Sequence, residues 1–180
     1  TDSGPYSLGS GTSKYSRAAI KAEWKSLMIA RKKANVPLVI GSCGTCGTNR
    51  MVDWMENITI ELAEELNQNI KIAKLYCQQE KNFIKKKFQL SKIFPLNPAP
   101  MLNDHLIEEM TNIVALAGAE QIQECINTGA EIILAGRTTD TAIISALPLM
   151  KGANPGSSWH GAKVVECGAL CSTNPTSGVV

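Results

Sequence analysis

Short apolar segments alternating with amphipathic stretches constrain this chain more than any other feature of its sequence. Each segment is shorter than an ordinary helix, which favours strands buried on both faces. We expect strands at residues 36–40, 70–77, 113–117, 131–135 and 164–165. The stretches between them carry apolar side chains every three or four positions. They predict helices at residues 17–34, 51–66, 80–88, 104–110 and 138–149, and a further helix around Cys125.

Strands that alternate with helices at this spacing are typical of βαβ units. We therefore expect an α/β fold with a mainly parallel sheet covered by helices on both faces, built as a single domain over residues 1–180. Ser16 and Thr138 are expected to cap the helices that follow them. Cys77 and Cys125 lie in apolar patterns and are expected in the core. We interpret the chain as a fragment, because it begins at Thr1 and ends in turn-forming residues.

The composition argues against several classes of function. The formal net charge is only +2, from 18 basic and 16 acidic residues, and aromatic residues make up 5%. A nucleic-acid-binding domain usually has a stronger basic surface and aromatic side chains for stacking, so we expect no nucleic-acid partner. No apolar run approaches the ~20 residues of a membrane span. Six cysteines are few for a disulfide scaffold of this length, so we expect a reducing, cytoplasmic location and no membrane partner.

Reactive side chains follow several predicted strands at the end where parallel α/β proteins bind their ligands. Ser42, Cys43, Gly44 and Thr45 follow the first strand, Arg137, Thr138 and Asp140 follow the fourth, and Glu166 follows the fifth. Because parallel strands end at one edge of the sheet, we expect Cys43, Arg137, Asp140 and Glu166 to line one cleft. Arg137 would hold a carboxylate or phosphate there, or it would only pair with Asp140.

The segment 41–47, GSCGTCG, concentrates glycine and cysteine residues within one short stretch. Its glycines let backbone N–H groups approach an anion at a helix N-terminus, but its spacing matches neither a dinucleotide fingerprint nor a phosphate loop. A tight turn is the plain alternative. Cys43 and Cys46 have the spacing of a redox pair, and together with Cys167 and Cys171 they have spacings that zinc accepts. Ordinary thiols explain them better, so we predict no redox couple and no metal, and the sequence identifies no cofactor.

A set of motifs runs in order along nearly the whole chain: DSGPY at 2–6, IGSCGT at 40–45, VDW at 52–54, AGRTTDTA at 135–142, ALPL at 146–149 and ECG at 166–168. Jointly they resemble the acyclic terpene utilisation family, AtuA. The resemblance implies a catabolic role in growth on acyclic terpenes such as citronellol and geraniol, through their acids and CoA esters. It implies no particular reaction.

One hypothesis is therefore an enzyme, such as a lyase or hydratase, that acts on a carboxylate or acyl-CoA intermediate. Its anionic substrate would be bound by Ser42, Gly44, Thr45, Arg137 and Thr138. Asp2, Asp140 and Glu166 would share the acid and base work, and Cys43 is a candidate nucleophile. The alternative is a non-catalytic subunit that binds a partner enzyme or a small ligand, which would expose a large apolar patch. Assembly into a homo-oligomer is compatible with both.

Overall fold

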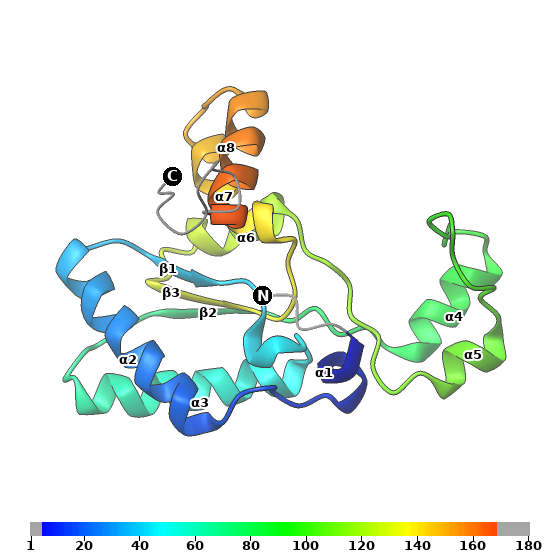
Figure 1. The fold of residues 1–180 in the computed structure, drawn as a ribbon, viewed down its shortest axis with the longest axis horizontal. Helices are drawn as coiled ribbons and strands as arrows, with labels where there is room; N and C mark the ends of the chain where they lie inside the picture. The colour runs from blue at the N-terminus through cyan, green and yellow to red at the C-terminus, as the bar shows by residue number, and fades with distance from the viewer. Residues whose placement is uncertain (1–4, 169–180) are drawn as a thin grey trace.

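A parallel sheet lies between two layers of helices in the computed structural model, which describes residues 5–168 (Figure 1). Its described strands are β1 (Leu38–Ile40), β2 (Ile72–Leu75) and β3 (Ile132–Ala135), in the order β1-β3-β2. Ile133 on the central strand pairs with Val39 on one side and with Ala73 on the other. All three strands run parallel, which confirms the predicted α/β class.

The helices mostly occupy the predicted stretches. They are α1 (Pro5–Ser10), α2 (Arg17–Ala34), the 3-10 turn η1 (Cys43–Thr45), α3 (Asn49–Glu65), α4 (Lys81–Gln89), α5 (Asp104–Glu109), α6 (Ala119–Asn127), α7 (Asp140–Met150) and α8 (Pro155–Cys167). Ser16 caps α2 as predicted, and its side chain accepts a hydrogen bond from the backbone N–H of Ala19 at 3.3 Å. No helix in the described part has the combination of length and hydropathy needed to cross a bilayer.

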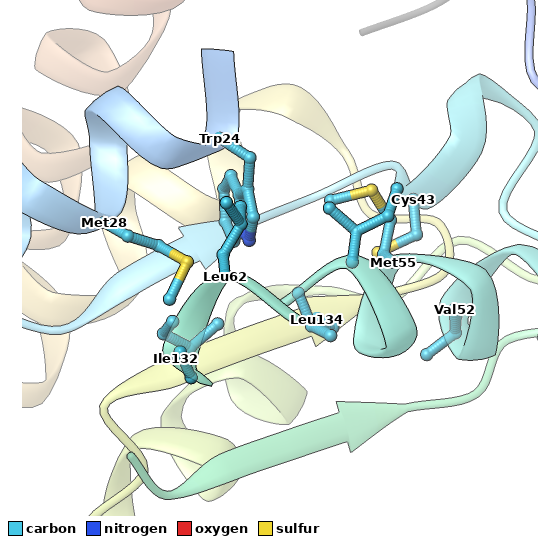
Figure 2. Close-up of a cluster of buried hydrophobic side chains, with 10 residues drawn as sticks. Trp24, Met28, Cys43, Val52, Met55, Leu62, Ile132 and Leu134 are labelled. Atoms are coloured by element: carbon cyan, nitrogen blue, oxygen red, sulfur yellow. The ribbon is translucent and has the colours of Figure 1, made fainter. Parts of the chain in front are cut away.

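Alternate residues of β3 face opposite helical layers, because successive side chains of a strand point to opposite faces. Ile132 and Leu134 pack against Trp24 and Met28 of α2 and Leu62 of α3, and Figure 2 shows this cluster in close-up. Ala135 belongs to a second cluster with residues of α6 and α7 on the other face. In Figure 1, α2 and α3 lie below the sheet and α6 and α7 above it, so both faces are covered as predicted.

Two predicted strands are not strands in the structure. Within 113–117, Val114 forms an isolated antiparallel bridge with Gln78, and Ala117 forms an isolated parallel bridge with Thr138. A segment that pairs in opposite directions with two different loops cannot continue in one register, so no ladder forms. Residues 164–165 lie within α8, whose start is set by Asn154 accepting a hydrogen bond from Ser157 N at 3.1 Å. A pair of valines is too short a strand signal to override that cap.

Two burial predictions also need correction. Cys77 is buried as expected, but Cys125 is only partly buried on α6. The segment 36–40 was expected to be buried on both faces, yet every residue of β1 is only partly buried. The reason is that β1 is an edge strand in the described sheet, with its outer side facing a cleft rather than another strand.

Candidate functional site

A cleft of about 650 Å³ lies along the outer edge of β1. One wall comes from α2 through Ile20, Trp24 and Leu27, and the opposite wall comes from α7 through Ile143 and Ile144. These side chains are all apolar, although Glu23 of α2 also lines the cleft, and the residues of β1 line it between the two helices. The lining residues come from helices on opposite faces of the sheet, so the cleft spans the β1 edge. Its main lining can bury a hydrocarbon chain.

The polar end of the cleft lies where β1 ends. Its lining there includes Ser42, Gly44 and Thr45 from the glycine-rich segment, Asp140 from α7 and Glu166 from α8. This places five of the residues singled out from the sequence around one cavity. It is also the position where ligands bind in parallel α/β proteins, beyond the carboxyl end of a strand.

The hydroxyls of Ser42 and Thr45 differ in what they bond. Each residue is only 7% exposed. The Thr45 hydroxyl donates to the carbonyl of Gly44 at 2.6 Å and accepts from the backbone N–H of Lys14 at 3.0 Å, so its single donor is used within the protein. The Ser42 hydroxyl forms no side-chain cap and no other hydrogen bond to the described residues. Because Ser42 lines the cleft and its hydroxyl is not used within the described part of the protein, it is the group left to bond a ligand.

Asp140 and Glu166 provide the carboxylates at the polar end. Asp140 is the first residue of α7, where a negative charge is stabilised by the helix dipole. Glu166 does not follow a strand, as the sequence suggested, but lies in the last turn of α8. Its carboxylate accepts a hydrogen bond from Lys163 at 2.6 Å, and this contact, followed by that from Cys167, lowers the pKa of Glu166. Glu166 is therefore ionised at neutral pH, and the same lowering of its pKa makes it a weaker base than a free carboxylate.

Cys43 does not line the cleft, although its neighbours do. It is fully buried in the cluster with Trp24 and Met55, as Figure 2 shows, and burial strongly raises its pKa. A thiol in this environment stays protonated, whereas a nucleophile must be a thiolate. Cys46 is buried as well, with its sulfur 3.4 Å from the Thr48 hydroxyl.

The zinc alternative finds no support in the described part of the chain. There, no three side chains of the ligating types His, Cys, Asp and Glu are grouped so as to hold a metal ion. Cys167 lies at the end of α8, on a different element from the buried pair Cys43 and Cys46. Cys171 lies outside the described residues, as does Asp2.

Arg137 and Thr138 follow β3 as expected but are not among the residues that line the cleft. The carbonyl of Arg137 accepts hydrogen bonds from Ala117 N at 2.9 Å and from the Cys77 thiol at 3.2 Å. Thr138 was expected to cap α7, but Thr139 occupies that position. The Thr138 hydroxyl instead donates to the carbonyl of Gly41 at 3.0 Å and ties the loop after β3 to the loop after β1.

The glycines of segment 41–47 are explained by close packing as much as by ligand access. Gly44 has a left-handed φ of 61°, and a Cβ there would lie 2.6 Å from the Cβ of Met51. A Cβ on Gly41 would lie 2.5 Å from the Thr138 hydroxyl oxygen. Larger residues at either position would push the segment off its neighbours, so the tight-turn alternative describes part of this motif.

Residues 8–15, which precede α2, lie against the loops that follow the strands. The side chain of Asn112 donates to the carbonyl of Leu8 at 2.8 Å, and Arg50 donates to the carbonyl of Gly11 at 2.7 Å. The backbone N–H of Lys14 also donates to the Thr45 hydroxyl, in the turn that follows β1. These contacts hold the segment beside the polar end of the cleft, where Tyr15 is one of the lining residues. Nothing in the sequence of this segment predicted this arrangement.

Sequence reasoning also missed the apolar walls. The apolar residues of α2 that line the cleft belong to the same stripe as the buried residues Trp24 and Met28. The signal in the sequence was the width of that stripe, and the structure shows its consequence: Leu27 is 48% exposed, although it lies one helical turn from buried Trp24 and beside buried Met28. When the apolar stripe of a helix is wider than the face that packs on the core, its outer apolar side chains stay available to bind a ligand.

Comparison with known proteins gives one finding. A family model described as "Acyclic terpene utilisation family protein AtuA" matches residues 9–173, which is most of the chain. No curated protein and no solved structure matches the chain significantly.

Proposed function

Because the chain belongs to the acyclic terpene utilisation family AtuA, we propose that it binds an intermediate of acyclic terpene or related branched-chain acid catabolism in the β1 cleft. The observation that carries the proposal is that this cleft joins mostly apolar walls, in which Glu23 of α2 is the charged exception among the described residues, to an end that carries Ser42, Asp140 and Glu166. Acyclic terpene derivatives are divided in the same way, with a branched hydrocarbon chain and a single oxygenated carbon.

Size and burial support this assignment. Ligand sites in proteins commonly measure ~300–1,000 Å³, and the cleft of about 650 Å³ lies within that range. Each CH₂ group transferred from water to the walls contributes about 0.8 kcal/mol, so a ten-carbon chain gains most of its affinity from Ile20, Trp24 and Ile143. The hydrocarbon would lie along the walls, and the oxygenated carbon would reach Ser42.

The polar end supports a reaction by proton transfer, and we assign a lyase or hydratase role to it. In a hydratase step, ionised Glu166 accepts a proton from water while the hydroxyl adds to C3 of a 2,3-unsaturated ester. The same proton then passes to C2, so that one water is added across the double bond. Asp140 would orient the water. Neither Arg137 nor Cys43 has a part in this step, because neither lines the cleft.

Thermal stabilisation by candidate ligands tests the binding proposal, since a ligand that binds the native state raises its melting temperature. We expect citronellol, geraniol and the CoA esters of their acids to stabilise the protein. Leu27→Glu should abolish the effect by placing a charge on the apolar wall. Ile29→Glu is a matched control, because Ile29 lies on the same helix with 50% exposure but does not line the cleft. Equal loss in both variants, or no stabilisation by any ligand, would contradict the proposal.

A specific observation favours a second candidate, a subunit that binds a partner protein. Helices α4 and α5 form an arm away from the sheet (Figure 1). The connection between them carries Phe94, Leu96 and Met101, which are 80%, 88% and 85% exposed. Large apolar side chains this exposed are typical of interaction surfaces. If the arm binds a partner, Phe94→Ser with Leu96→Ser should prevent assembly in sedimentation experiments and leave ligand binding in the cleft intact.

A further inference from the structure

We infer that the cleft accepts the uncharged acyl group of an ester or thioester and discriminates against the ionised free acid. This inference rests on the proposed function and names the form in which the substrate binds. It departs from the sequence-based expectation that a negative charge of the substrate is held at this site. The reasons are the charges around the polar end and the hydroxyl of Ser42, which lines the cleft and has no hydrogen-bond partner among the described residues.

The ionisable side chains that line the described cleft are the carboxyls of Glu23, Asp140 and Glu166, and the phenol of Tyr15. No Lys, Arg or His is among the lining residues of the described part. Lys163 offsets the charge of Glu166 through its hydrogen bond, but Glu23 and Asp140 form no ion pair with any described residue. A carboxylate at the polar end would therefore meet like charges beside low-dielectric walls, which disfavours its binding.

The N-terminus of α7 favours an anion within the described part of the cleft, but Asp140 already supplies a negative charge there. Arg137, the cation that the sequence suggested for an anionic substrate, does not reach the lining. A substrate whose only charges lie far from its carbonyl, such as a thioester with its phosphates outside the cleft, avoids the repulsion.

Ser42 supplies the attractive contact for a neutral carbonyl. Only 7% of the residue is exposed, and it lines the polar end of the cleft. Its hydroxyl has no hydrogen-bond partner among the described residues. A hydroxyl donates one hydrogen bond, which suits the carbonyl oxygen of an ester. Thr45 beside it cannot take this part without giving up its bonds to Gly44 and Lys14.

Calorimetric titration of the protein with citronellic acid and with its methyl ester at pH 7.5 tests the inference. The free acid is ionised at this pH, because carboxylic acids titrate near pH 4–5. We expect the ester to bind at least about tenfold more tightly than the acid. Asp140→Asn should reduce that ratio to about threefold or less by removing the nearest unpaired negative charge.

Ser42→Ala should weaken ester binding by about fivefold, the usual effect of losing one hydrogen bond. Ser158→Ala is the matched control: Ser158 is equally buried, but its hydroxyl bonds to the carbonyl of Asn154 at 2.9 Å and it does not line the cleft. Equal affinities for acid and ester, or a ratio of affinities that Asp140→Asn leaves unchanged, would overturn this inference but not the proposed function. If neither ligand binds, or if Leu27→Glu leaves both affinities unchanged, the proposed function itself fails.

Discussion

Gly47 and Gly136 lie against one another at the carboxyl edge of the sheet, so closely that neither position accommodates a side chain. A Cβ on Gly136 would lie 2.6 Å from the carbonyl oxygen of Gly47, and a Cβ on Gly47 would lie even closer to the carbonyl oxygen of Gly136. This contact joins the loop after β1 to the loop after β3 and fixes the polar end of the cleft. Two glycines far apart in the sequence therefore share one structural role.

The contact predicts a large loss of stability in Gly47→Ala. Gly47 has a φ of 75°, and the new methyl group would meet backbone atoms that cannot move aside. Gly152→Ala is the control, since Gly152 has a similar φ of 78° but open space around its Cβ position. We expect the control to lose about 1 kcal/mol from the backbone conformation alone. Gly47→Ala should lose at least about 2 kcal/mol more in denaturant unfolding, the range for overpacked sites. Similar losses in both variants would contradict the contact.

A buried hydrogen bond beneath the cleft wall gives a second prediction. The indole N–H of Trp24 donates to the Thr59 hydroxyl at 2.8 Å, which donates in turn to the carbonyl of Met55 at 2.7 Å. Thr59→Val keeps the shape but leaves the indole N–H buried without a partner, which should cost about 1–3 kcal/mol of unfolding free energy. Thr59→Ser retains the hydroxyl and should cost less. The idea fails if the two variants unfold at the same denaturant concentration.

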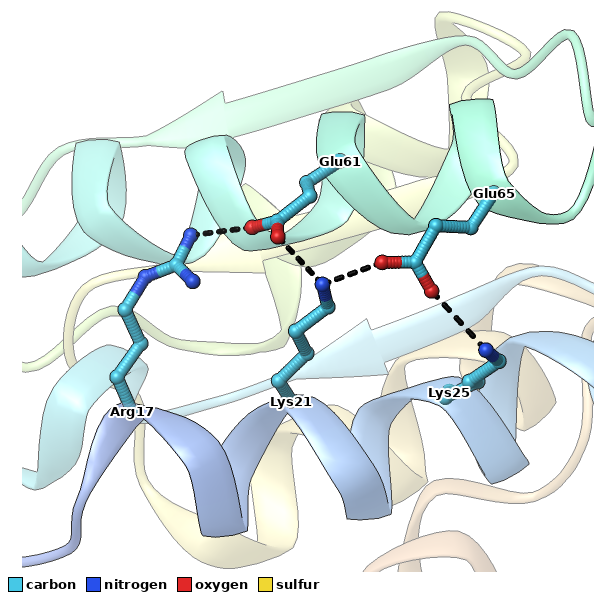
Figure 3. Close-up of polar contacts among 5 residues, drawn as sticks. All are labelled: Arg17, Lys21, Lys25, Glu61 and Glu65. Atoms are coloured by element: carbon cyan, nitrogen blue, oxygen red, sulfur yellow. Dashed lines mark hydrogen bonds and ion pairs between the residues drawn. The ribbon is translucent and has the colours of Figure 1, made fainter.

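The ionic network between α2 and α3 predicts a salt-dependent contribution to stability. Lys21 donates to both Glu61 and Glu65, while Arg17 pairs with Glu61 at 2.6 Å and Lys25 with Glu65 at 3.0 Å (Figure 3). Lys21→Met should lower the melting temperature more than Lys25→Met, because Lys21 bridges two carboxylates. The difference should vanish in ~1 M NaCl, where screening acts over ~3 Å. A difference that persists at high salt would point to packing of the Lys21 stem instead.

The same network should respond to pH. Hydrogen bonds from Lys21 are the main cause of the lowered pKa values of Glu61 and Glu65. A carboxyl whose pKa is lower in the folded state stabilises the fold above its unfolded pKa of ~4.3, and this contribution disappears as pH falls through the lowered folded value. The melting-temperature gap between the native protein and Lys21→Met should thus be full at pH 7 and should close as the pH falls through the lowered pKa values of the two carboxyls. A gap that stayed constant over this range would exclude the carboxylates as its cause.

Thiol labelling distinguishes a buried Cys43 from a nucleophile. Burial raises the pKa of Cys43, so iodoacetamide at pH 8 should modify it only after unfolding. Partly buried Cys125 should react faster in the native protein and serves as an internal comparison. Modification is measured for each cysteine by peptide mass. Rapid reaction of Cys43 in the native state would restore its candidacy as a nucleophile.

The sequence by itself determined the features that depend on neighbours along the chain. The Ser16 cap and the apolar stripe were enough to predict α2 with the bounds it has, because a helix satisfies its own backbone hydrogen bonds. The short apolar runs likewise located β1, β2 and β3, and the βα alternation determined their parallel direction. The polar end of the cleft followed from the same rule, since Ser42, Thr45 and Asp140 come directly after strands or at the helix start that follows.

Only the tertiary structure decided which segments pair and which side chains face the cleft. Residues 113–117 look like a strand but lack a neighbour with one continuous register, and a strand exists only through its partner. Ser42 and Cys43 are adjacent in sequence, yet one lines the cleft and the other lies in the core, because the turn of η1 points them apart. Strand pairing and side-chain orientation depend on packing between elements that are distant in the chain, and local sequence patterns do not predict that packing.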